Sequence, residues 1–149
     1  MNLTQWVDAG TLDLSDTVVA QRLCEMAGES DSRVGLAVGL LVAALRNGSV
    51  CVDLAAVRDR DAADVAVDLP WPEPQAWLAA VRASPLSGNP PVLRLLDDLL
   101  YFDRYWLEEQ QVCGDVAARL TAYPPPDAAA PDLTRLFPEG YAEQRAAAE

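Results

Sequence analysis

The sequence predicts a mainly α protein, a helical bundle that carries a small antiparallel β-hairpin or three-strand element. Two observations favour this fold class: most apolar residues recur with the helical period, and only a few short segments alternate or run apolar in the manner of strands. The chain has 149 residues, of which 51% are hydrophobic, so it is long enough for one ordinary core and short for two. We therefore expect one compact domain with tails.

The first predicted helix covers residues 15–28. Ser15 and Asp16 are capping residues at its start, and Gly28 is a typical residue at a helix end. The helical period places four apolar residues on one face, which we expect to be buried: Val19, Leu23, Met26 and Ala27.

The second predicted helix is apolar from Val34 to Leu45 and stops at Asn47 and Gly48, which is typical of a buried central helix. Its apolar run is well short of the ~20 residues that cross a bilayer, so we expect no membrane span. Gly35 and Gly39 are four residues apart and predict a close approach by another helix, since a glycine inside a helix costs about 1 kcal/mol and needs a packing reason.

Strand signals follow. Residues 49–54 alternate apolar and polar with β-branched valines, and residues 92–96 and 99–103 form two runs around Asp97 and Asp98, which predicts a hairpin with the acidic pair at its turn. Between them we expect a short helix or turn and a loop, and then a third helix over 74–83. The apolar face of that third helix is formed by Trp77, Leu78 and Val81.

The stretch LLYFDRYWLEEQQV, residues 99–112, is predicted to be a strand-to-helix junction, because the helical period begins at Arg104. The face of this last helix carries Tyr105, Val112, Val116 and Leu120. Its aromatic residues allow two interpretations. Packing at the junction is favoured, because each ring buries a large area; the other is that one ring and Arg104 point outward as interface anchors.

The composition excludes several kinds of site. The chain has no lysine, so it cannot supply the lysine of a phosphate-binding P-loop. It has no histidine, so it cannot form an ordinary Cys/His zinc site or a Ser–His or Cys–His nucleophile. The adjacent carboxylates Asp97-Asp98 and Glu108-Glu109 are typical of a turn and a solvated helix face rather than a metal site. We predict no catalytic residue, no bound metal and no cofactor in this chain.

The formal net charge of −12 disfavours direct binding to nucleic acid and indicates either a role in solubility or a basic protein partner. The three cysteines, Cys24, Cys51 and Cys113, are odd in number and far apart, so we expect reduced thiols that behave as small buried hydrophobes. The N-terminal stretch shows no signal-peptide pattern, and a cytoplasmic location is expected.

Four stretches occur in an order that resembles one family: GSVCVDL, WLAAVRASPL, PPVLRLLDDLLYFDRYWLEEQQV and LFPEGYAEQRAAAE. Together they are similar to the N-terminal region of the alpha subunit of bacterial exodeoxyribonuclease V, RecD. The segment LYFDRYWLEEQ resembles that family's strand-to-helix junction, although Phe102 and Leu107 replace its commoner residues. The final stretch resembles the segment that leads into the first motor domain of the family.

The resemblance implies a docking domain over residues 1–123, a Pro/Ala linker over 124–132 and the incomplete start of a motor domain over 133–149. It implies that Gln144 contacts the adenine of ATP in a longer parent protein, which would be an ATP- and Mg-dependent 5′-to-3′ DNA helicase in double-strand break repair and recombination. The fragment itself would be non-catalytic. It would dock the motor onto the gamma subunit, in a complex that also holds the beta subunit.

The candidate interface and junction residues are Tyr101, Arg104, Tyr105, Trp106 and Glu109. The alternative to this hypothesis is an unrelated acidic α-helical adaptor that shares only the pattern of helices and hairpin.

Overall fold

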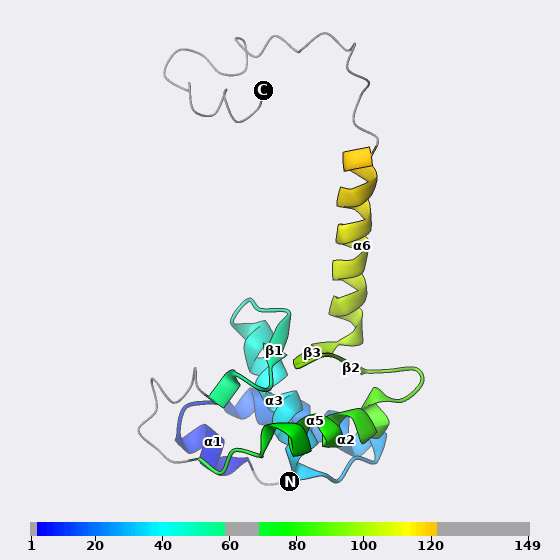
Figure 1. The fold of residues 1–149 in the computed structure, drawn as a ribbon. Helices are drawn as coiled ribbons and strands as arrows, with labels where there is room; N and C mark the ends of the chain where they lie inside the picture. The colour runs from blue at the N-terminus through cyan, green and yellow to red at the C-terminus, as the bar shows by residue number, and fades with distance from the viewer. Residues whose placement is uncertain (1–2, 59–68, 122–149) are drawn as a thin grey trace, which may run out of the picture. The chain divides into compact units, whose positions relative to one another are not determined.

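The computed structural model describes residues 3–58 and 69–121 (Figure 1). The mainly α fold class and its small antiparallel sheet are confirmed. The described elements are α1 (Thr4–Asp8), α2 (Leu14–Ala27), α3 (Ser32–Arg46), β1 (Cys51–Asp53), α5 (Pro74–Ala83), the 3-10 helix η1 (Pro85–Ser87), β2 (Leu93–Leu96), β3 (Leu99–Phe102) and α6 (Asp103–Thr121).

The chain divides into two units, residues 1–112 and 113–149. The described part of the second unit is the end of α6, residues 113–121. The linker expected over 124–132 and the motor segment expected over 133–149 lie outside the described residues, as does most of the loop expected before α5.

Helix α1 was not predicted, and it contributes Trp6 to the core. Leu3 and Leu12, on either side of α1, pack directly on α3: a Cβ added at Gly39 would lie 3.2 Å from Leu12 Cδ1 and 3.6 Å from Leu3 Cδ1. Close packing at Gly39 is therefore confirmed, but the expectation of an approaching helix is wrong, because the side chains that approach belong to residues on either side of α1. Trp6 also meets Trp71, with ring centroids 4.5 Å apart in an edge-on arrangement.

The N-cap residue of helix α2 is Asp13, rather than Ser15 or Asp16 as expected. Asp16 is its capping-box partner. The predicted buried face is wrong in part, because Val19 and Met26 are exposed and the fully buried residues are Asp16, Ala20 and Cys24. The carboxylate of Asp16 is only 1% exposed and accepts hydrogen bonds from the Asp13 N–H and from Arg46 at the end of α3. The buried side of α2 is therefore centred on Asp16 and Ala20, and it includes a charged residue that pairs with α3.

At the end of α2, Gly28 takes a φ of +69°, and the N–H of Glu29 donates to the carbonyl of Cys24, which terminates the helix as predicted.

Helix α3 is the central element: it contacts α2, α5, β1 and β3. Its residues from Val34 to Leu41 are all buried, as expected of a helix that is apolar on every side.

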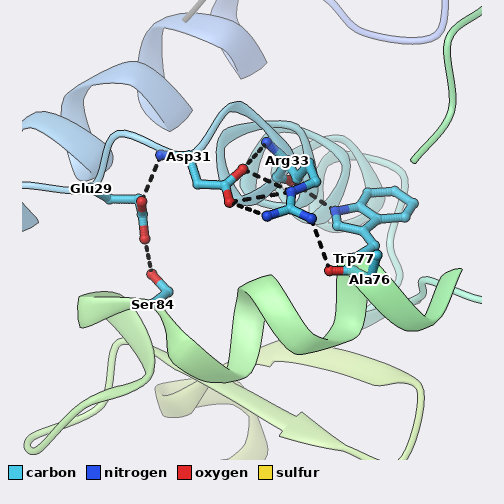
Figure 2. A network of polar contacts seen from close by, with 6 residues as sticks. All are labelled: Glu29, Asp31, Arg33, Ala76, Trp77 and Ser84. Carbon is cyan, nitrogen blue, oxygen red and sulfur yellow. Dashed lines mark hydrogen bonds and ion pairs between the residues drawn. The ribbon is translucent and has the colours of Figure 1, made fainter. Parts of the chain in front are cut away.

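A polar network holds α5 against the turn between α2 and α3 (Figure 2). The Trp77 indole N–H donates to the carbonyl of Arg33 at 2.8 Å, and the Arg33 guanidinium donates to the carbonyl of Ala76 at 3.2 Å. The buried Ser84 hydroxyl donates to the carboxylate of Glu29 at 2.5 Å. Hydrogen bonds from Arg33 lower the pKa of Asp31, whose carboxylate also caps α3.

The sheet has the order β1-β3-β2, with both neighbours antiparallel to β3. The predicted hairpin is confirmed: β2 and β3 are joined by Asp97 and Asp98, and Asp97 takes a φ of +51°, which Asp tolerates better than most residues. Val52, Leu100 and Leu95 are paired across the three strands and face the core. The strand predicted over 49–54 is present but shorter.

Helix α6 follows β3 without an intervening loop and has no fully buried residue. The helix start predicted at Arg104 is thus confirmed within one residue. Among the described residues, no helix is long and apolar enough to span a membrane.

Candidate functional site

The strand-to-helix junction is built on the face of the sheet opposite the core. Register pairs Tyr101 on the central strand with Cys51 on one side and Arg94 on the other, so the three side chains share one face. Because α6 starts directly after β3, its first two turns supply the side chains that meet this row. The junction therefore forms where sequence-distant strands and the start of α6 come together.

Arg94 is the central cation of the junction. Its Nε donates to Asp103 Oδ1 at 2.7 Å, and the same two side chains form an ion pair. Its guanidinium carbon lies 4.0 Å from the centroid of the Trp106 ring, in cation–π geometry. Asp103 also donates its backbone N–H to the carbonyl of Val92 at 2.9 Å. These contacts anchor the first turn of α6 to β2.

Tyr101 is the buried aromatic residue of the junction, with only 7% of its surface exposed. Burial, followed by hydrogen bonding with the Cys51 thiol and the charge of Glu109, raises the pKa of Tyr101 to about 12. The phenol therefore stays neutral at physiological pH, and it links β3 to both β1 and α6.

The other predicted junction residues are more accessible. Trp106, Tyr105 and Glu109 are half-buried, and the Trp106 indole N–H finds no acceptor among the described residues. Arg104 is exposed over 80% of its side chain, and its Nε donates to Glu108 one turn along the helix. The structure thus brings Tyr101, Trp106 and Glu109 together with Arg94, and it leaves Arg104 at the surface. Their role in an interface stays a prediction.

An open groove of about 760 Å³ lies beside the junction. Its walls come from α2, α3, the segment before β2, the end of β3 and the first turns of α6, and they are mainly apolar. Its apolar lining residues include Val19, Val42, Leu45, Val92, Phe102 and Leu107. Three of them remain substantially exposed: Val19 and Val92 at 41% and Leu107 at 51%.

Sequence reasoning missed Arg94, Asp103 and the groove. The register of the predicted hairpin was the available signal for Arg94, since a turn at Asp97 and Asp98 pairs Arg94 with Tyr101. No comparable signal pointed to the groove, because its walls come from segments that are far apart in the sequence.

The other groups considered from the sequence are the possible metal ligands, the cysteines and Gln144. In residues 3–58 and 69–121, no group of three or more His, Cys, Asp or Glu side chains is placed to hold a metal ion. The expectation of buried cysteines is confirmed for Cys24, whose burial raises its pKa, and is wrong for Cys113, which is exposed. Gln144, the predicted adenine contact, lies outside the described residues.

The comparisons with known proteins agree on one family. Residues 8–101 match the family model of the N-terminal domain of RecBCD enzyme subunit RecD. The chain is 63% identical over 142 residues to the RecBCD enzyme subunit RecD of Mycobacterium tuberculosis (strain ATCC 25618 / H37Rv) and 60% identical over 142 residues to that of Mycolicibacterium smegmatis. Each match covers 95% of this chain, and the chain spans 24% of the length of these curated relatives.

Proposed function

The chain belongs to the RecD family as a counterpart of its N-terminal domain, and from that premise we propose that it is a non-catalytic docking domain for the other subunits of a RecBCD-type complex. The family match removes the alternative of an unrelated acidic adaptor. The observation that carries the docking role is the exposed apolar groove beside the junction, since contiguous exposed apolar surface often marks an interaction site.

The partners we propose are the gamma subunit and, within the same complex, the beta subunit. The longer protein would be an ATP- and Mg-dependent 5′-to-3′ DNA helicase that acts in double-strand break repair and recombination in the cytoplasm. In that protein Gln144 would contact the adenine of ATP. The chain itself has no lysine, so the P-loop lysine must come from residues outside it.

Co-purification tests the docking role. The 149-residue chain is mixed with the beta and gamma subunits of the same organism, and the mixture is separated by size-exclusion chromatography. We expect the chain to elute with the larger subunits. If it elutes alone at micromolar concentrations of all three proteins, the docking role is refuted.

A second measurement tests the non-catalytic role. We expect the purified chain to release no phosphate from ATP above a blank without protein. We also expect negligible affinity for single- or double-stranded DNA at physiological salt, because its net charge is −12. Turnover of ATP, or tight DNA binding that weakens with salt, would contradict this part of the proposal.

A further inference from the structure

Helix α6 is attached to the rest of the domain by polar contacts at its start. Arg94 of β2 pairs with Asp103, and its guanidinium lies against the ring of Trp106. We call these three residues the latch. All three are half-buried, and none of the 19 residues of α6 is fully buried. The start of the helix is therefore held by a few contacts centred on one arginine.

On the side of α2 and α3, an open groove borders α6. Val19 of α2, Val42 of α3 and Leu107 of α6 are walls of the same space of about 760 Å³. Leu107 is 51% exposed, so much of its apolar surface stays in water. Because burial of apolar surface is the dominant favourable contribution to folding, α6 gains little stability from this side.

The sequence of α6 does not compensate for its weak packing. Residues 112–116, Val-Cys-Gly-Asp-Val, are five consecutive residues of low helix propensity, and glycine is the least favourable of them. A Cβ added at Gly114 would meet nothing within 4 Å, so no close packing explains this glycine. Helices in proteins gain most of their stability from packing, so α6 without the latch would be only marginally stable in water.

The hydrophobic core does not depend on α6. The buried residues that form the core cluster lie between Leu3 and Leu100, and none of them belongs to α6. Loss of the helix would therefore expose no residue of the buried core. A segment with few buried apolar contacts can open by itself while the rest of the domain stays folded.

We infer that α6 is a separate order–disorder unit of this protein, which is helical while the latch is closed and melts when it opens, with α3 and the sheet still folded. Residues 113–121 of the second unit belong to the same helix, so the latch in the first unit controls whether they are helical. This switch is independent of the proposed docking function.

Amide hydrogen exchange of the 149-residue chain, followed residue by residue by NMR, tests the inference. The amides of residues 107–112 donate within α6, and those of residues 36–43 donate within the buried helix α3. After correction for intrinsic rates, we expect residues 107–112 to exchange at least about 100-fold faster than residues 36–43, yet more slowly than an unfolded chain. Equal protection of the two helices, or no protection of α6, would overturn the inference.

Val81→Ala separates independent opening of α6 from unfolding of the whole domain. Val81 of α5 is fully buried, so the substitution weakens the core. We expect residues 36–43 to exchange at least about tenfold faster and residues 107–112 to stay within about twofold of the unchanged chain. Equal acceleration of both helices would show that α6 opens only when the domain unfolds.

Low concentrations of urea give the same test without a substitution. We expect urea to accelerate exchange of residues 36–43 steeply and that of residues 107–112 only slightly, because melting of α6 exposes less surface than unfolding of the domain. Parallel acceleration of the two helices by urea would contradict an independent α6.

Arg94→Ala tests the latch itself. We expect residues 107–112 to exchange about tenfold faster, since the substitution removes both the ion pair and the cation–π contact. Arg94→Lys keeps the charge but loses the planar guanidinium, so its effect should be intermediate. The control is Arg22→Ala, because Arg22 is exposed and pairs with Glu25 of its own helix, and it should change exchange in α6 less than about twofold. An Arg94→Ala chain in which α6 exchanges like that of the control would refute the latch.

Discussion

Arg94 lies between two side chains of α6: its guanidinium carbon is 4.0 Å from the centroid of the Trp106 ring, and its Nε donates to Asp103. This relationship joins the middle of β2 to the first turn of α6. Because none of the residues of α6 is fully buried, contacts of this kind, rather than a deep apolar interface, attach the start of the helix.

Trp106→Ala is expected to lower the free energy of unfolding by about 2 kcal/mol, less than for a fully buried tryptophan, since the ring is half-buried and stacks on Arg94. Trp106→Phe, which keeps an aromatic face for the guanidinium, is the control and is expected to lose less. Urea denaturation measures both. A Trp106→Ala protein with unchanged stability would show that the ring does not pack at the junction.

Arg104→Ala is expected to leave the melting temperature unchanged, because its side chain is 80% exposed and its ion pair with Glu108 is screened by water. The matched variant Arg94→Ala is expected to lower the melting temperature, since it removes the partner of both Asp103 and Trp106. Thermal melts followed by circular dichroism compare the two. Equal effects of the two substitutions would contradict the placement of these arginines.

Tyr101 is expected to make stability fall in alkaline solution. Its pKa is about 12 in the folded chain against an ordinary value of 10.0, so between these values the folded chain retains a proton that the unfolded chain has released. The contribution of the neutral phenol is therefore complete below pH 10 and is lost as the pH rises toward 12. Denaturant titrations across this range should show a shallower fall for Tyr101→Phe, and parallel curves would refute the assignment.

Asp31 is expected to make the stability of the fold decrease in acidic solution. Hydrogen bonds from Arg33 hold its pKa below the ordinary value of 3.8, so the folded chain binds this proton less readily than the unfolded chain. Its stabilising contribution is present above that value and is lost as the pH falls through the lowered pKa. Asp31→Asn should flatten the stability profile below about pH 4. Glu25→Gln, on the exposed surface of α2, serves as the control.

Local sequence patterns determined most elements of this protein. Periodicity, caps and turn residues placed α3, α5, the hairpin and the start of α6, because these signals act between residues that are near one another in the chain. The resemblance to RecD also rested on local stretches, and the family comparison confirms it. The roles proposed for Arg104 and Gln144 stay predictions.

Tertiary structure decided which faces are buried and where the groove lies. Asp16 is buried in an ion pair with Arg46, thirty residues later in the chain, while Val19 and Met26 are exposed, and no helical period could reveal that partner. The pairing of strands placed Arg94 beside Tyr101, and the packing of α2 and α3 near the start of α6 formed the groove. Burial depends on contacts between segments distant in the sequence, so a one-dimensional pattern predicts the elements but not the surfaces that they leave exposed.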